Sequence, residues 1–492
     1  MPGITSGIWQ PRGDQLMFET TAAVILAAGQ GTRMRSRTPK VLHEILGRPL
    51  VNFPVKLAQA LGVERIVVVV GHGSDAVRAA VLEAAPNAQF AVQVEQRGTA
   101  DAVKAAAEAT VGCDSVLILS GDVPGLSAAT VRALAEARQH HKTRLVAAGF
   151  RPADMTGYGR LVTAGGKLQR IVEDRDATGS DKACRDANAG IYFVDRDFLF
   201  DAIGRVSTDN DQGEFYLTDI AAIAAEAGQP GAVVICDDHF EVSGINNRAQ
   251  LSDIAERFRK DTNRDHMLNG VTMWDPANTT IELEVTLGRD VTVHGGVQLL
   301  GSTTVAEAAT VMAGSVIRNA TIGEGVLVKP YCVIEDSVMK TGSMCGPFAH
   351  LRPGTVLCES SKVGNFVETK KTTLGVGSKA SHLSYIGDAT VGRNVNIGAG
   401  TITCNYDGVS KHHTHIEDRV FIGSNSELVA PLTLGEECLI GAGTTVTTNV
   451  PAGALAISRA KQVDIEGWSK KHGPHARKRR ADKKKSESND TP

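Results

Sequence analysis

Residues 416–446 read IEDRVFIGSNSELVAPLTLGEECLIGAGTTV, with an aliphatic side chain at every sixth position: Ile416, Ile422, Leu428, Leu434, Ile440 and Val446. The same spacing occurs earlier, at Val316, Ile322, Val328 and Ile334. A six-residue period is typical of a parallel β-helix, in which each aliphatic side chain stacks inward on its equivalent one coil away. A β-sandwich has no fixed short repeat and is therefore disfavoured. We predict a hexapeptide-repeat β-helix over residues 270–468, whose open ends require oligomerisation or added caps.

The segment before the repeat has a different pattern. AAVILAAG (22–29), RIVVVVG (65–71) and SVLILSGD (115–122) are candidates for buried parallel strands, with helix-like segments at 51–61, 75–85 and 100–110. We therefore predict an α/β Rossmann-like domain over residues 21–246, with ligands bound beyond the carboxyl ends of its strands. Residues 247–269 are expected to form one linker helix, because Leu251, Ile254, Ala255 and Phe258 recur with helical spacing.

Both ends of the chain are expected to lack regular structure. Residues 1–20 resemble an unstructured extension, and Met17 offers an alternative start. Residues 469–492 form a basic tail, in which the stretch from Lys470 to Lys485 carries nine Lys or Arg against one Asp. Such charge runs are usually solvated and disordered. No base-reading motif accompanies this one, so no nucleic-acid partner is expected.

The composition favours a soluble globular protein. The 492 residues are 42% hydrophobic and carry a formal net charge of −3, which excludes disorder for most of the chain. No apolar run approaches the roughly 18 residues of a membrane span, so no membrane insertion is expected. The 8 cysteines contain no CxxC pair, which favours a reduced, cytoplasmic compartment.

A glycine-rich turn, LAAGQGTRM (26–34), follows the first predicted strand. It lacks the GK[ST] of a Walker A loop and the third glycine of a dinucleotide fingerprint. Arg33 and Lys40 follow closely, so backbone amides and two cations converge where a triphosphate fits. Asp122 also follows a predicted strand. A divalent cation that keeps most of its waters needs only one or two protein oxygens of this kind, although a carboxylate that caps a turn is the alternative.

The motif LAAGxGTRMxxxxPK, present as residues 26–40, resembles the signature of sugar-1-phosphate nucleotidyltransferases. With the hexad repeat behind it, the chain from about residue 21 to 468 resembles the bacterial bifunctional GlmU family, which makes UDP-N-acetylglucosamine. The resemblance implies a left-handed β-helix, a cytoplasmic homotrimer, and acetyl transfer from acetyl-CoA to glucosamine 1-phosphate. It further implies uridylyl transfer from UTP to N-acetylglucosamine 1-phosphate, with Mg²⁺ as cofactor and pyrophosphate as the second product.

The resemblance also implies which residues serve uridylyl transfer. The phosphates and base of UTP would be held by Leu26, Ala28, Gly29, Arg33 and Lys40. The uracil-contacting segment is matched by Gln93, Gln96, Gly98 and Thr99. The family usually has Gly-His or Ala-His after Gly-Thr, whereas this chain departs from it with Ala100-Asp101. N-acetylglucosamine would be held by Gly159, Glu173 and Asn188, and Mg²⁺ by Asp122 and Asn246. No protein nucleophile is needed, because positioning and charge neutralisation by Mg²⁺, Arg33 and Lys40 supply the catalysis.

Acetyl transfer would be served by a second set of residues. A histidine without context is more often a surface or hydrogen-bonded residue than a base. Within SHLSYIGD, however, His382 matches the general base of the resembling family. An amine must be neutral to attack a thioester, so such a base is worth about 10² to 10⁴ in rate. The resemblance assigns the sugar phosphate to Arg352 and Lys370, and the orientation of glucosamine to Tyr385 and Asn396. It assigns the acetyl-CoA groove to Ala399, Asn405, Tyr406, Ser424, Ala442 and Arg459.

Two other functions are compatible with this architecture. The β-helix is a non-catalytic regulatory module in one alternative, and the whole chain is a scaffold without turnover in the other. The presence of His382 with Arg352, Lys370, Tyr385 and Asn396 favours the bifunctional enzyme over the first. The set Arg33, Lys40, Asp122 and Asn246 argues against the second. The histidine run from His412 to His415 is interpreted as a solvated loop rather than a metal site, because adjacent residues cannot close a tetrahedron alone.

Overall fold

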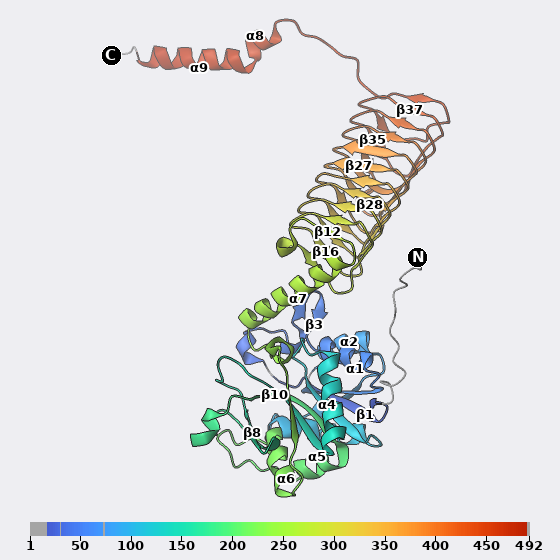
Figure 1. Ribbon diagram of the computed structural model, residues 1–492. Coiled ribbons are helices and arrows are strands. Elements are labelled where there is room, and N and C mark those ends of the chain that lie inside the picture. The colour runs from blue at the N-terminus through green and yellow to red at the C-terminus, as the bar shows by residue number, and fades with distance from the viewer. Residues whose placement is uncertain (1–16, 30, 72–73, 490–492) are drawn as a thin grey trace. The chain divides into compact units, whose positions relative to one another are not determined.

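The computed structural model describes residues 17–29, 31–71 and 74–489 (Figure 1). The chain divides into two units. The first runs up to Asn269 and includes Pro276–Val285 and Leu299–Gly301, and the second holds Gly270–Asp275, Thr286–Gln298 and the chain from Ser302 onward. Among the described residues, no helix combines the length and apolar character needed to cross a membrane.

The first unit is built on a nine-stranded sheet with the order β11-β7-β10-β6-β1-β4-β5; β8 also pairs with β10, and β9 pairs with β8. Strand β1 pairs in parallel with β4 and β6, whereas β10 runs antiparallel to β6 and β7. The predicted largely parallel sheet is therefore confirmed. Its strands are β1 (Thr21–Leu26), β4 (Arg65–Gly71), β5 (Gln89–Gln93), β6 (Ser115–Ser120), β7 (Leu145–Phe150), β8 (Arg160–Ala164), β9 (Lys167–Val172), β10 (Ala187–Asp195) and β11 (Ala232–Ile235).

Helices cover both faces of this sheet, because alternate residues of each strand point to opposite sides. In β1, Ala23 and Ile25 join a buried cluster with α1, α2 and α4, whereas Val24 joins a second cluster with α3, α5 and α6. The helices are α1 (Asn52–Ala60), α2 (Asp75–Ala84), α3 (Thr99–Lys104), α4 (Ala128–His141), α5 (Arg196–Ile203) and α6 (Ile220–Glu226). The helix expected over 100–110 is shorter than predicted, since α3 ends at Lys104 and a 3₁₀ turn follows at Glu108–Thr110.

The predicted linker helix is α7 (Arg248–Leu268). The Asn247 side chain caps its start by accepting a hydrogen bond from the backbone N–H of Gln250. Its apolar stripe packs near the short hairpin of β2 (Glu44–Ile45) and β3 (Arg48–Pro49), where Ile254 is buried and the ring of Phe258 lies 5.1 Å from that of Phe53. The helix is thus anchored to the α/β unit along its apolar face.

The repeat folds into parallel coils, and their strands form two sheets. An 11-stranded sheet contains β12 (Thr272–Met273), β15 (Thr292–Val293), β18 (Thr310–Val311), β21 (Leu327–Val328), β24 (Met344–Cys345), β27 (Lys362–Asn365), β29 (Lys379–His382), β31 (Asn396–Ile397), β34 (Phe421–Ile422), β37 (Leu439–Ile440) and β39 (Leu455–Ala456). A 17-stranded sheet contains β13 (Thr280–Ile281), β14 (Thr286–Leu287), β16 (Gln298–Leu300), β17 (Thr304–Val305), β19 (Val316–Arg318), β20 (Thr321–Ile322), β22 (Val333–Glu335), β23 (Val338–Met339), β25 (His350–Leu351), β26 (Val356–Leu357), β28 (Glu368–Leu374), β30 (Tyr385–Val391), β32 (Ile402–Cys404), β33 (Thr414–Ile416), β35 (Glu427–Val429), β36 (Leu432–Leu434) and β38 (Thr445–Val446).

Aliphatic side chains stack inside the solenoid from coil to coil, as the period predicts. Val311 pairs with Val328, Val328 with Cys345, and Cys345 with Val363, and all four side chains are fully buried. The six residues of the quoted repeat, from Ile416 to Val446, are likewise buried. The prediction is wrong at Val316, where the neighbouring Ile317 points inward, because Ile317 and Ile322 are only five residues apart at that corner.

The structure departs from the expected terminal segments. The extension predicted for residues 1–20 ends earlier, since Phe18 is buried against Phe193 at a ring distance of 6.1 Å; residues 1–16 lie outside the described part of the chain. The basic tail expected to be disordered is helical over α8 (Trp468–His472) and α9 (Pro474–Asn489). Lys, Arg and Ala are strong helix formers and proline is favoured at a first helical position, which explains this difference.

Candidate functional sites

A cavity of about 340 Å³ lies at the carboxyl ends of β1, β5 and β6 in the first unit. It brings together most residues that the motif predicts for the nucleotide. Of the predicted residues, the cavity is lined by Leu26, Ala28, Gly29, Lys40, Gln93, Gln96, Gly98, Thr99 and Asp122. Such a position is where open α/β sheets bind ligands. The predicted segments, which are far apart in sequence, therefore share one concave surface.

The side chains of the two predicted cations, Arg33 and Lys40, contact those of the two predicted metal ligands, Asp122 and Asn246. The Lys40 ammonium donates to the Asp122 carboxylate and lies 3.5 Å from Oδ1 of Asn246, which also accepts from Nη2 of Arg33 at 2.8 Å. Gly31 makes this approach possible: its φ is +61°, and a Cβ there would lie 2.5 Å from Cβ of Lys40. The oxygens of Asp122 and Asn246 thus converge on a positive charge.

The residues predicted for the sugar form a second group beside this cavity. The backbone N–H of Asn188 donates to the carbonyl oxygen of Gly159 at 2.7 Å, and a Cβ on Gly159 would lie 3.4 Å from Oε2 of Glu173. Thr218 donates to Glu173 at 3.1 Å, and the adjacent Leu217 N–H donates to Oγ1 of Thr99 in the nucleotide cavity. This pair of contacts joins the sugar group to the base group. Burial raises the pKa of Glu173, although the Thr218 hydrogen bond opposes the shift.

Glu173→Gln is expected to stabilise the protein and to weaken its reaction. The fold favours the neutral carboxyl, so its charge at pH 7 destabilises the folded state, and the amide removes that charge while still accepting from Thr218. The melting temperature should rise at pH 7. The gain should vanish below about pH 4, where the Glu173 carboxyl is neutral in both the folded and the unfolded protein. The KM for N-acetylglucosamine 1-phosphate should rise about tenfold. The exposed Glu83→Gln serves as the control, and an equal stability gain there would contradict the account.

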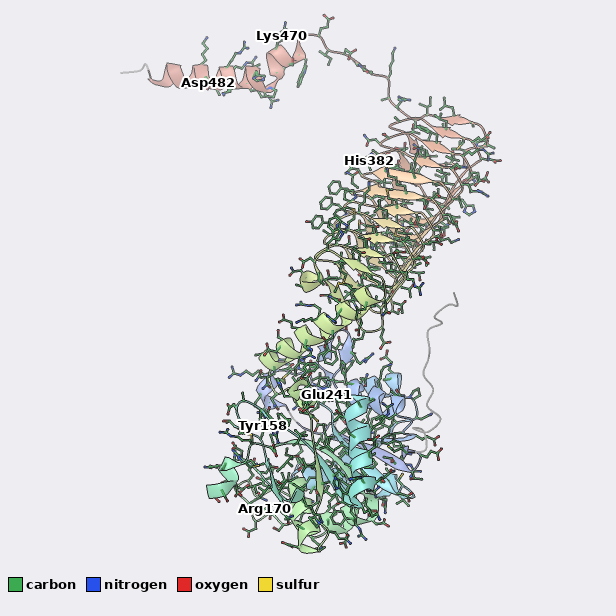
Figure 2. All side chains as sticks on the ribbon, in the orientation of Figure 1. Tyr158, Arg170, Glu241, His382, Lys470 and Asp482 are labelled. Atoms are coloured by element: carbon green, nitrogen blue, oxygen red, sulfur yellow. The ribbon has the colours of Figure 1, made fainter. Side chains whose placement is uncertain are left out.

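In the second unit, His382 lies exposed at the end of β29 (Figure 2). Its Nδ1 lies 2.6 Å from Oδ1 of Asn365, the residue paired with it one coil earlier. Because an amide oxygen can only accept, this contact assigns the proton of a neutral imidazole to Nδ1 and leaves Nε2 as the nitrogen available to act as a base. Asn365 is not among the residues that the motifs predict. The signal that identifies it is its place in NFVETKK, one 17-residue coil before His382.

Asn365→Ala is expected to lower kcat for acetyl transfer about tenfold, because the imidazole loses the group that fixes its tautomer and orientation. Asn365→Asp keeps an acceptor at the same place and should restore most of the rate. Uridylyl transfer should not change. The measurement is thiol release from acetyl-CoA, and an Asn365→Ala enzyme with the normal rate would contradict the positioning role.

The predicted sugar-phosphate residues occupy one ladder of the 17-stranded sheet. Leu351 pairs with Thr369, and Lys370 with Gly387, so Arg352, Lys370 and Gly387 take equivalent positions on successive coils. A Cβ on Gly387 would lie 2.4 Å from Oη of Tyr385, so the glycine leaves the space that the tyrosine hydroxyl fills. The Tyr385 hydroxyl therefore lies over the position that aligns with Arg352 and Lys370 on the preceding coils. Arg352 also donates to Glu368 at 2.7 Å.

The predicted acetyl-CoA residues continue the ladder of His382. Extending the register of β29, β31, β34 and β37 aligns His382, Ala399, Ser424 and Ala442 on four coils. Asn396 begins β31 in the same sheet, and Nη2 of Arg459 comes within 3.1 Å of a Cβ placed on Gly441. Ala399, Ser424 and Ala442 thus form a row of small side chains that starts at His382 and runs along the solenoid axis.

The loop between β32 and β33 carries the remaining predicted residues. Nδ2 of Asn405 donates to the Asp388 carboxylate, and the Lys411 ammonium lies 5.1 Å from the ring centre of Tyr406. The histidine run follows in the same segment. His412 contacts Asp407 at 2.7 Å, and His413 contacts Thr390 at 2.9 Å. Hydrogen bonds from Ser410, His412 and Val409 lower the pKa of Asp407.

The fold and the two clusters define a nucleotidyltransferase joined to a hexapeptide-repeat acyltransferase. A model described as MobA-like NTP transferase domain matches residues 23–186, and one described as hexapeptide repeat of succinyl-transferase matches residues 413–448. The chain is 47% identical to "Bifunctional protein GlmU" of Pelobacter propionicus over 92% of this chain and 98% of that protein. Proteins of the same name from Geotalea uraniireducens and Streptomyces avermitilis are 48% and 43% identical, each over 92% of this chain and over 99% and 95% of their own lengths.

The chain belongs to the bifunctional GlmU family. It combines an N-acetylglucosamine-1-phosphate uridylyltransferase with a glucosamine-1-phosphate acetyltransferase, and its second unit has the left-handed type of β-helix. A solved structure of UDP-glucose pyrophosphorylase complexed with UDP-glucose matches 49% of this chain and 99% of its own, at a TM-score of 0.41 and 17% identity.

Proposed function

We propose that the cavity of the first unit is the uridylyl-transfer site and that the His382 ladder of the second is the acetyl-transfer site. The observation that carries the proposal is that the residues predicted for each reaction lie together, one set in each unit. Lys40, Asp122 and Asn246 meet in one unit, and His382 lies on one ladder with the predicted acetyl-CoA residues in the other.

In the uridylyl-transfer site, Leu26, Ala28 and Gly29 line the space beside Lys40, where UTP binds. The phosphate of N-acetylglucosamine 1-phosphate attacks the α-phosphorus of UTP in line, the bond to the β-phosphate breaks, and pyrophosphate leaves. Arg33 and Lys40 neutralise charge on the phosphates, and the group of Gly159, Glu173 and Asn188 orients the sugar.

Asp122 and Asn246 suit a magnesium ion. Their side chains present hard oxygen donors, and both already contact the Lys40 ammonium, so they accommodate a cation between them. When bound, Mg²⁺ neutralises phosphate charge and orients the leaving group. The remaining steps belong to the protein: Lys40 and Arg33 hold the phosphates, and the cavity walls position the nucleotide.

In the acetyl-transfer site, Arg352 and Lys370 bind the phosphate of glucosamine 1-phosphate, and Tyr385 and Asn396 orient the sugar. Nε2 of His382 accepts a proton from the amine as nitrogen attacks the thioester carbonyl of acetyl-CoA. The C–N bond forms, the C–S bond breaks, and the thiol of CoA leaves. The small residues Ala399, Ser424 and Ala442 give the cofactor a groove, with Asn405, Tyr406 and Arg459 at its sides.

We further propose a homotrimer that works in the cytoplasm. The exposed rings of Tyr331, Phe348 and Phe366 stack along one solenoid corner at 5.3 and 5.4 Å, and Leu383 continues the row beside His382. An exposed apolar row of this kind supports packing between copies at the acetyl-transfer site. The described cysteines are free thiols, which supports a reducing compartment.

The complete reaction tests the proposed function. The purified chain, supplied with glucosamine 1-phosphate, acetyl-CoA, UTP and Mg²⁺, is expected to form UDP-N-acetylglucosamine, CoA and pyrophosphate in equal amounts. Omitting UTP should leave N-acetylglucosamine 1-phosphate as the product. If UTP were needed before any CoA appeared, the proposed order of the two reactions would be wrong.

A further inference from the structure

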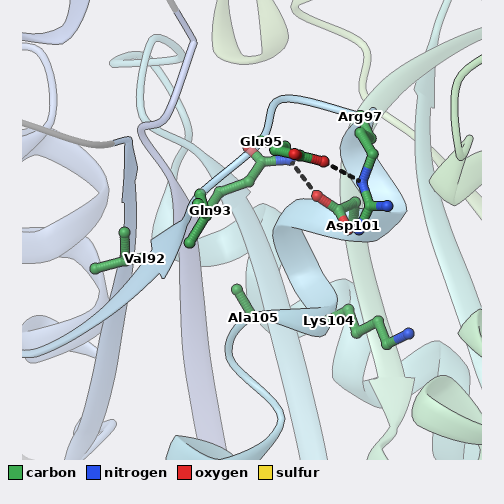
Figure 3. Close-up of a pocket in the computed structure, with 8 residues that line it drawn as sticks. Val92, Gln93, Glu95, Arg97, Asp101, Lys104 and Ala105 are labelled. Carbon is green, nitrogen blue, oxygen red and sulfur yellow. Dashed lines mark hydrogen bonds and ion pairs between the residues drawn. The ribbon is translucent and has the colours of Figure 1, made fainter.

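A second cavity, of about 290 Å³, shares a wall with the nucleotide cavity. It is lined by Val92, Gln93, Val94, Glu95, Arg97, Asp101, Lys104 and Ala105 (Figure 3). Gln93, the last residue of β5, lines both cavities and is only 5% exposed. The residues that contact the Gln93 amide from the second cavity therefore decide whether its oxygen or its nitrogen faces the nucleotide cavity.

The orientation of the Gln93 amide is fixed by two acceptors. Its Nε2 donates to the carbonyl oxygen of Gly98 at 3.0 Å and to Oδ2 of Asp101 at 3.1 Å. Both amide hydrogens are used in this way, and the reversed amide would place an oxygen against two acceptors. The carbonyl oxygen Oε1 is therefore the group that Gln93 offers to a ligand.

Asp101 divides its two oxygens between two partners. Oδ2 accepts from Gln93 (Figure 3). Oδ1 accepts from Nη2 of Arg97 at 3.2 Å. The Asp101 side chain is 15% exposed. Because the two contacts use different atoms, substitutions can separate them. Asp101 is also where the chain departs from the family pattern, so its role is not supplied by the resemblance.

An acceptor facing the base discriminates between pyrimidines. The pairing edge of uracil has a single donor, N3–H, between two carbonyl oxygens, so an acceptor oxygen pairs with uracil only there. Cytosine has a lone pair at N3, and an oxygen placed against it leaves two acceptors in contact.

We propose that Asp101 is a positioning residue for nucleotide specificity. It holds Gln93 as an acceptor for N3–H of uracil, and so excludes cytosine and any uracil without that hydrogen. The proposal rests on the proposed uridylyl-transfer function and deepens it, since it concerns the base in the same cavity.

Asp101→Leu removes the acceptor and tests the proposal directly. The ratio of kcat/KM for UTP to that for CTP should fall at least about tenfold, with most of the loss in the KM for UTP. Asp101→Asn retains an acceptor oxygen for Gln93 and should keep a ratio near that of the wild type. Arg97→Ala is the matched control, because of the two partners of Asp101 it removes only that of Oδ1 and leaves Gln93 in place. Its ratio should also stay unchanged, although the variant loses the Arg97 contacts with Glu95 and Phe215 as well.

A second measurement needs no substitution. The wild-type enzyme should use 3-methyluridine triphosphate at least about tenfold less efficiently than UTP, as it should CTP. Equal use of the methylated nucleotide would overturn the proposal. An unchanged ratio in Asp101→Leu, with a lowered ratio in Gln93→Leu, would also overturn it while leaving the uridylyl-transfer site in place. An unchanged KM for UTP in Gln93→Leu would instead overturn the assignment of the cavity, and with it the proposal.

Discussion

Asp122→Asn is expected to lower uridylyl transfer at least about 10³-fold and to leave acetyl transfer unchanged. The amide has no charge for the proposed Mg²⁺, and it removes the only carboxylate that the Lys40 ammonium contacts among the described residues. The loss should fall on kcat more than on the KM for UTP, since charge neutralisation matters most as pyrophosphate leaves. Pyrophosphate release and thiol release are measured on the same preparation.

Asp201→Asn is the matched control for this substitution, because Asp201 lies exposed on α5. Both activities of that variant should equal those of the wild type. If Asp122→Asn kept more than about a tenth of the uridylyl-transfer rate, the role of Asp122 as the charged cation ligand would be wrong.

His382→Ala is expected to have the reverse effect. Removal of the imidazole takes away the group that accepts the proton of the amine, so kcat for acetyl transfer should fall about 10² to 10⁴-fold. Uridylyl transfer from added N-acetylglucosamine 1-phosphate should be unaffected. Only the neutral amine attacks the thioester, so raising the pH enlarges the reactive fraction of the substrate and should recover part of the lost rate in the variant.

Lys379→Ala provides the control on the same strand, since Lys379 is exposed on β29 three residues before His382. It should retain both activities. A normal rate of thiol release by His382→Ala, or an equal loss in Lys379→Ala, would remove His382 from the acetyl-transfer step.

Most of the fold follows from local pattern. The six-residue period predicts the solenoid because each stacked side chain repeats one coil later, and the continuous apolar runs of strands such as β1 predict a parallel sheet covered on both faces. The pattern fails where geometry is not periodic. A shortened corner turns Ile317 inward in place of Val316, and Phe18 is buried by contact with a distant strand.

The site residues also fall into those that the sequence predicts and those that only the structure shows. Sequence motifs predict which residues touch ligands, since a motif fixes their types and spacing, but they do not show what holds each one. Asn365 meets His382 only because one coil places them side by side, and Asp101 meets Gln93 only because α3 folds back on the end of β5. Such partners are set by tertiary contacts and become visible only in the structure.

Two independent sites in one chain are the central claim, and complementation tests it most directly. Asp122→Asn and His382→Ala are purified separately and then mixed with glucosamine 1-phosphate, acetyl-CoA, UTP and Mg²⁺. Neither variant alone should form UDP-N-acetylglucosamine at an appreciable rate, whereas the mixture should form it at a rate near that of the wild type, because N-acetylglucosamine 1-phosphate passes through solution. A mixture as inactive as either variant, or a single variant that has lost both half-reactions while still folded, would contradict the account.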